Sequence, residues 1–110
     1  MTKKKLLLVG GLALIPLHAY AADEPERTER YPAILANNCF TCHGPGGRSP
    51  GEIPSLNQLS AADLATAVKQ FRSGERASTV MGRHAKGYSD ADIEAIAQYI
   101  AGLNAKGGAK

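Results

Sequence analysis

The sequence lacks several features that would each indicate a common class of protein. Its 110 residues include no tryptophan and only two cysteines, and no segment repeats another. No run alternates apolar and polar residues as a half-buried strand does, so we expect no β-sheet. The mostly apolar stretch from Leu6 to Leu17 is too short to cross a bilayer as a helix. Because this length allows only one domain, what remains is a small helical fold.

A basic and then apolar segment at the N-terminus has the pattern of a secretory signal peptide. Lys3 to Lys5 precede the apolar stretch, and Ala19, Tyr20 and Ala21 form a small-x-small cleavage site. We therefore expect residues 1–21 to be a signal peptide and residues 22–110 to be one exported domain, in a bacterial periplasm. An uncleaved membrane anchor is the alternative; after cleavage we expect no membrane span.

The domain that would remain carries no excess charge. The full chain has a formal net charge of +3, and the three lysines of the leader account for it. This balance argues against nucleic acid or an anionic membrane as a partner. Half of the remaining bases crowd into one region with a single acidic residue among them, and they could pair with a buried acidic group, meet an acidic partner, or form a solvated face. They are Lys69, Arg72, Arg76, Arg83 and Lys86.

The same domain also has few side chains with which to build a core. Beyond residue 21, only 18 apolar side chains are larger than alanine or cysteine. A core of that size struggles to offset an ordering cost of roughly 1.5 kcal/mol per residue. Small domains of this kind usually need a disulfide, a metal or a cofactor. The sequence therefore predicts a component beyond the polypeptide.

Three helices are expected, separated by two long loops. Helical spacing runs from about Arg30 to Cys42, with Pro32 in the first turn, and the charged residues 22–29 are interpreted as a leader or a frayed turn. Ser60 and Ser89 each have an aspartate three residues on, a variant of the capping box, and open the second and third helices. Gly74 is expected to end the second, and Leu103 the third. The loops are expected to span residues 43–59 and 75–88, and the tail is expected to be loose.

The chemistry is concentrated in Cys39-Phe40-Thr41-Cys42-His43. Cys-x-x-Cys-His is the signature of c-type haem attachment. Two thiols one helical turn apart can form thioethers with the two vinyl groups of a porphyrin, and the histidine then lies beneath the iron. The alternatives are a disulfide, a thioredoxin-like pair or half a zinc site. The pair would need a βαβ context, and His43 and His84 do not give a common zinc spacing.

Met81 is the candidate for the second axial ligand of the iron. It is the only methionine beyond the leader, and it falls in the expected second loop, where the chain can turn a thioether back toward the opposite haem face. His84 is the rival ligand, and a flexible core filler is the other alternative for Met81. Methionine sulfur raises the reduction potential, and two strong axial ligands leave no open position for a substrate.

Pro54 is a candidate for support of the haem histidine. A proline in the loop after His43 could place a backbone carbonyl to accept a hydrogen bond from the imidazole Nδ1. Such a bond fixes the tautomer and strengthens the ligand. An ordinary turn proline is the alternative.

Together, the motif at Cys39–His43, the lone Met81 and a closing amphipathic helix resemble the class I c-type cytochromes, over residues 30–103. The segments 49–56 and 71–90 are similar to the single-haem cytochrome subunit of flavocytochrome c sulfide dehydrogenase. The resemblance implies an all-α class I cytochrome c fold around one covalent haem c, with Cys39 and Cys42 holding the haem and His43 and Met81 as axial ligands. It also implies a flavoprotein (FAD) partner that oxidises sulfide.

The expected function is transfer of single electrons by a subunit docked on that flavin enzyme, which hands them to a downstream acceptor. No catalysis is expected from this chain alone. One alternative is a free-standing carrier between respiratory or photosynthetic complexes. A haem enzyme or gas sensor is another alternative, and it would need an open sixth position on the iron.

Overall fold

The computed structural model describes residue 10 and residues 24–107, with side chains from residue 30 onward. The expected signal peptide therefore lies outside the described residues, apart from Gly10. The described residues form four α-helices, α1 (Glu24–His43), α2 (Ala61–Ser73), α3 (Met81–Ala85) and α4 (Asp90–Gly107), with a 3-10 turn η1 (Pro45–Gly47) after α1. No strand occurs in this described part, so the all-α fold class is confirmed. No described helix is long and apolar enough to be a membrane span.

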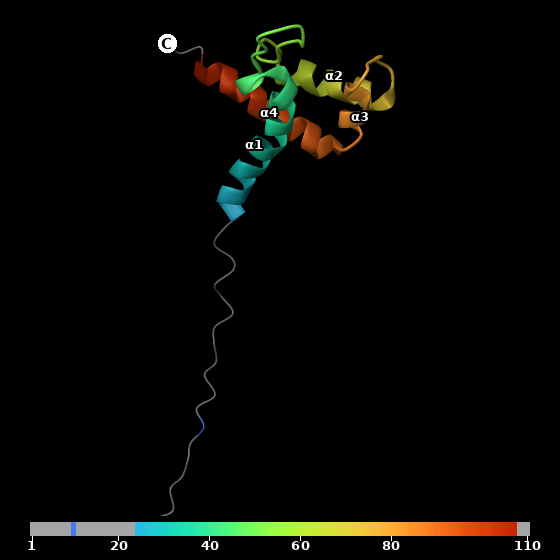
Figure 1. The fold of residues 1–110 in the computed structure, drawn as a ribbon. Helices are drawn as coiled ribbons and strands as arrows, with labels where there is room; N and C mark the ends of the chain where they lie inside the picture. The colour runs from blue at the N-terminus through green and yellow to red at the C-terminus, as the bar shows by residue number, and fades with distance from the viewer. Residues whose placement is uncertain (1–9, 11–23, 108–110) are drawn as a thin grey trace, which may run out of the picture.

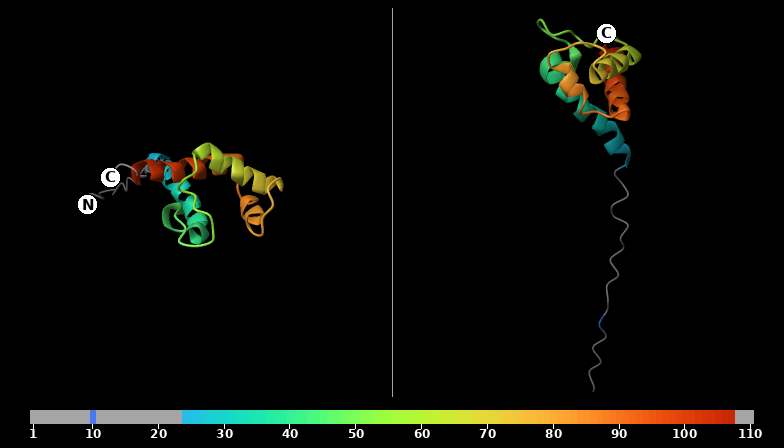
Figure 2. Two further views of the ribbon diagram at one scale, coloured as in Figure 1. Left: turned by 90° about the horizontal axis from the view of Figure 1, so that it is seen from above. Right: turned by 90° about the vertical axis from the view of Figure 1, so that its right-hand side faces the viewer.

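The helices form an open arrangement in which α4 is central. α2 runs beside α4, and α1 crosses α4 with its first turns projecting from the rest of the fold (Figure 1). The last turns of α1 and the short α3 both extend from the same side of the α2–α4 pair, and they make no close approach to one another in the described chain (Figure 2).

The core is small and rests on one face of α4. The apolar spacing of α4 buries Ile93, Ile96, Ala97 and Ile100. Ala36 from α1, with Leu64 and Ala65 from α2, completes this cluster. Small side chains at the crossings let the helix axes approach closely.

Local chemistry sets the helix ends much as expected. The Ser60 hydroxyl accepts a hydrogen bond from the Asp63 amide at 3.1 Å, and Gly74 ends α2 with φ +83°. At α4 the capping box is reciprocal. The Ser89 hydroxyl accepts from the Asp92 amide at 3.2 Å, while Asp92 Oδ2 accepts from the Ser89 amide at 2.9 Å.

The structure differs from the expected boundaries in three places. α1 begins at Glu24, so residues 24–29, interpreted as part of a leader or a frayed turn, are helical, and Pro32 lies inside the helix. The second expected loop contains α3, and α4 continues beyond Leu103 to Gly107. Glutamate and arginine favour helix, but the first turns of α1 contain no apolar residues at helical spacing. The sequence therefore contains no sign that the helix begins before Arg30.

Candidate cofactor site

Cys39 and Cys42 lie on the last turns of α1, three residues apart and therefore on one face of the helix. Both thiols are free; Cys39 is half-buried and Cys42 is exposed. Burial raises the pKa of the Cys39 thiol above its ordinary value. Within the described chain, no group of three or more potential ligands among His, Cys, Asp and Glu could hold a metal ion, so the zinc alternative gains no support.

His43 is the last residue of α1, and a loop carbonyl sets its imidazole. The Nδ1 atom lies 2.6 Å from the carbonyl oxygen of Pro54. A carbonyl oxygen only accepts hydrogen bonds, so Nδ1 is the donor, and in the neutral imidazole the free lone pair is then on Nε2. The half-buried ring therefore has one nitrogen occupied by the protein and one suited to bind a metal.

Met81 does not lie in irregular chain, contrary to the expectation that a loop is needed there. It is the first residue of the five-residue α3, and the chain changes direction just before it. The Ser78 hydroxyl accepts from the Gly82 amide at 2.8 Å, which holds the start of the helix. Met81 is half-buried, whereas the rival ligand His84 is exposed on the same short helix.

The described chain leaves apolar side chains uncovered in the segments that contain Pro54 and Met81. Ile53, next to Pro54, is 43% exposed, and Val80, next to Met81, is 56% exposed. Among large side chains, only Ile93 and Ile100 are fully buried in the described part, and no aromatic side chain is. A large apolar group lying between the end of α1 and α3 would cover this surface and enlarge the core.

Two members of the basic cluster have partners that the sequence analysis did not identify. Lys69 Nζ lies 2.5 Å from Glu94 Oε1, and Arg72 pairs with Asp90 while donating to the Tyr88 carbonyl oxygen at 3.1 Å. These contacts tie α2 to α4, and the Arg72 guanidinium lowers the pKa of Asp90.

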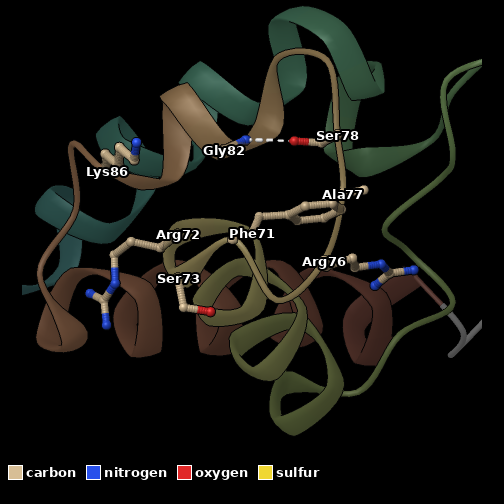
Figure 3. Close-up of a pocket in the computed structure, with 9 residues that line it drawn as sticks. Phe71, Arg72, Ser73, Arg76, Ala77, Ser78, Gly82 and Lys86 are labelled. Carbon is tan, nitrogen blue, oxygen red and sulfur yellow. Dashed lines mark hydrogen bonds between the residues drawn. The ribbon is translucent and has the colours of Figure 1, made fainter.

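The other three bases remain exposed around α3. A hollow of about 270 Å³ separates the end of α2 from α3, and Phe71 points across it toward Ala77 (Figure 3). The Arg76 guanidinium lies 5.0 Å from the centre of the Phe71 ring. No carboxylate of the described residues forms an ion pair with Arg76, Arg83 or Lys86. These three bases are defined here as the α3 basic surface.

Sequence reasoning missed the serines that shape the site. Ser78 holds the start of α3, and the Ser55 hydroxyl accepts from the Ser49 amide at 2.9 Å beside Pro54. A serine among glycines and prolines indicates a turn but does not identify its partner.

Comparison of the sequence with known proteins identifies its family. Residues 26–100 match the family model described as cytochrome C oxidase, cbb3-type, subunit III. The chain is similar to the cytochrome subunit of sulfide dehydrogenase from Chlorobaculum tepidum, at 46% identity over 79 residues, which cover 72% of each chain.

Two further relatives are more distant. Cytochrome c-553 of Helicobacter pylori (strain 26695) is 35% identical over 68 residues, covering 60% of this chain and 71% of the relative. The thiosulfate dehydrogenase electron acceptor of Stutzerimonas stutzeri is 35% identical over 72 residues, covering 62% of this chain but only 33% of the relative. The Cys-x-x-Cys-His motif, with uncovered apolar side chains nearby, fits a covalent haem c. The chain belongs to the class I c-type cytochromes and is a small monohaem electron-transfer protein.

Proposed function

We propose that Cys39 and Cys42 hold the haem through thioether bonds and that His43 and Met81 bind its iron. The observation that carries this proposal is the contact of 2.6 Å between His43 Nδ1 and the Pro54 carbonyl oxygen, which leaves Nε2 for the metal. The two thiols lie on the same helix end as His43, and Met81 lies on the separate segment α3.

The two proposed ligands determine what the site can do. When bound, haem supplies an iron that alternates between the ferric and ferrous states and carries one electron. If His43 and Met81 both bind that iron, it would have no free position for a substrate. The chain's own residues therefore bind and orient the group, and Met81 raises the reduction potential.

The partner we propose is an FAD-containing flavoprotein that oxidises sulfide. The relative that shares 46% identity is a cytochrome subunit of sulfide dehydrogenase. Oxidation of one sulfide to elemental sulfur releases two electrons, so the flavoprotein would pass them to this chain one at a time and a downstream acceptor would remove each in turn.

The surface of the chain is suited to such a docked role. On α1, Ile34 is 61% exposed and Tyr31 is 50% exposed, one turn apart. Exposed apolar side chains of this size favour burial against a partner. The α3 basic surface could meet an acidic patch on the same partner. We also propose export to the periplasm, with removal of residues 1–21.

A free-standing carrier is the second candidate function. The observation that favours it is the similarity to cytochrome c-553 and to the thiosulfate dehydrogenase electron acceptor. In that case the donor would change and the proposed haem ligands would stay the same.

The test is purification of the native protein through a tag after Lys110, followed by absorption spectroscopy and reduction assays. The proposed subunit should carry haem and flavin bands together, and sulfide should reduce the haem faster in that complex than in the isolated cytochrome. The rate with the isolated cytochrome gives the direct reduction of haem by sulfide, and this rate must be subtracted from the rate in the complex.

Two interface variants sharpen this test. Ile34→Glu should release the flavoprotein because it places a charge on the exposed apolar side of α1, whereas Thr66→Glu places the same charge on an exposed site of α2 and should not. A flavin-free preparation whose haem is reduced by thiosulfate once a thiosulfate dehydrogenase is added would favour the carrier. Haem without flavin and without acceleration by sulfide would refute the subunit assignment.

A further inference from the structure

We infer that Ser55 is a positioning residue for His43. The Ser55 hydroxyl holds the Pro54 carbonyl against the His43 imidazole and thereby helps to set the reduction potential. The inference rests on the proposed role of His43 as an axial ligand. It follows from the way in which the loop of residues 48–55 is closed.

The hydrogen bond to Pro54 affects the iron through the imidazole. Donation from Nδ1 to a carbonyl 2.6 Å away makes the ring more electron-rich and Nε2 a stronger donor. A stronger donor favours the ferric state and so lowers the reduction potential. Any residue that keeps this carbonyl in place therefore affects the potential without touching the haem.

One side of the loop is closed by Gly47. Its carbonyl oxygen accepts two hydrogen bonds, from the Leu56 amide at 2.7 Å and from the Asn57 amide at 3.1 Å. Gly47 has φ +77°, and a Cβ there would lie 3.1 Å from Leu56 Cβ, so this position favours glycine. These contacts fix the chain directly after Ser55.

The other side is closed by the serine side chain itself. The half-buried Ser55 hydroxyl accepts from the Ser49 amide at 2.9 Å, across the base of the loop. The only other hydrogen bond between loop residues here is local, from the Gly51 amide to the Ser49 hydroxyl at 3.3 Å. The cross-loop contact at the Pro54 end of the loop therefore depends on one hydroxyl.

The peptide between Pro54 and Ser55 is held on both sides. The proline ring restricts φ before the carbonyl, and the Ser55 hydroxyl and the Leu56 amide restrict the chain after it. Without the hydroxyl, the Ser49 amide loses its partner and the peptide can rotate away from His43. Water can then compete for the imidazole proton.

The test uses the holoprotein and measures its midpoint potential. Ser55→Ala should raise the potential, because the imidazole loses part of its hydrogen bond. Mutation of an outer-shell partner typically costs about 10- to 100-fold in metal affinity or activity. Ser55 only supports such a partner, so we expect a smaller effect, about threefold in the ferrous-to-ferric ratio. This shift is about 28 mV at about 59 mV per tenfold for one electron.

Two variants separate positioning from a general effect on the loop. Ser55→Thr keeps the hydroxyl and should restore the wild-type potential. Ser49→Ala removes a hydroxyl from the same loop but keeps the amide that donates to Ser55, so its potential should match that of the wild type. An equal shift in Ser49→Ala and Ser55→Ala would overturn the inference.

Nuclear magnetic resonance gives a second readout on the same samples. The His43 Nδ1 proton should exchange with deuterium faster in Ser55→Ala than in the wild type. A paramagnetically shifted His43 signal with unchanged exchange and potential would overturn the positioning role alone. In the ferric protein, a His43 signal without any paramagnetic shift would instead refute its proposed role as a ligand, so the two failures are distinguishable.

Discussion

Substitution of Gly44 offers a direct test of the turn that follows the proposed haem histidine. Gly44 has φ +83°, and a Cβ placed on it would lie 2.0 Å from the Arg48 carbonyl oxygen and 2.7 Å from the Arg48 carbonyl carbon. Both atoms belong to the backbone, so no side chain can move aside. Gly44→Ala therefore forces the turn to open.

The expected loss of stability has two parts. Gly44 combines its positive φ with ψ 163°, a conformation that is essentially confined to glycine and costs another residue about 1–3 kcal/mol. Opening the turn also breaks the hydrogen bonds from the Gly47 amide to the Gly44 carbonyl oxygen and from the Arg48 amide to the Pro45 carbonyl oxygen, each worth about 1 kcal/mol. Gly44→Ala should therefore lower the free energy of unfolding by about 3–5 kcal/mol.

Gly46 provides a matched control in the same turn. It has φ +62°, but a Cβ there would have no atom within 4 Å. Gly46→Ala should therefore lower the free energy of unfolding by only about 1–2 kcal/mol, the cost of the backbone conformation. The gain from a stiffer unfolded chain is common to both variants and cancels in the comparison. Gly44→Ala should therefore be less stable than Gly46→Ala by at least about 2 kcal/mol, the value of the two lost hydrogen bonds.

The assay is denaturant unfolding of the holoproteins, followed by circular dichroism and haem absorption, with the slope and the midpoint both fitted. Holoprotein from Gly46→Ala but none from Gly44→Ala would also support the argument. Equal stability of the two variants would refute it, because the clash would then have no cost.

Three further outcomes are expected. Met81→Ala should lower the potential and let the reduced protein bind carbon monoxide, seen in its absorption spectrum; a wild type that binds carbon monoxide as readily would contradict a closed iron. Ser78→Ala should destabilise α3 by about 1 kcal/mol and allow an added ligand such as imidazole to displace Met81 at lower concentration, whereas unchanged displacement would exclude a role for the Gly82–Ser78 contact.

The third outcome concerns pH, since hydrogen bonds from Ser89 lower the pKa of Asp92. The stability that this carboxylate contributes should be present above its unfolded pKa of about 3.9 and lost as the pH falls through its lower folded pKa. Unfolding midpoints of the wild type and Asp92→Ala should therefore converge below about pH 4, and a constant difference would contradict this account.

The helix ends could be predicted because capping is local. Ser60 and Ser89 each meet an amide three residues on, and Gly74 adopts the conformation that suits glycine. Five-residue α3 is too short to show a helical period, and it forms through packing on α2 and the contact with Ser78. No pattern in residues 81–85 could have predicted it.

Separation along the sequence also limited what could be predicted about the site. The motif at Cys39–His43 is contiguous and was identified at once, and the possibility of a carbonyl from Pro54 could be stated because proline restricts its own loop. The ion pairs of Lys69 and Arg72 join residues 25 and 18 positions apart. A count of charges along the sequence could not supply those partners, because they depend on how α2 lies on α4.

The separation of α1 from α3 makes the two sides of the proposed haem environment unequal in stiffness. His43 ends a 20-residue helix that is packed on α4 and closed by a hydrogen-bonded loop. Met81 begins a short arm that closely approaches only α2 among the described helices. A disturbance at Met81 can therefore move α3 while Cys39, Cys42 and His43 keep their positions. Met81 could then leave the iron and bind it again without unfolding of the rest of the protein.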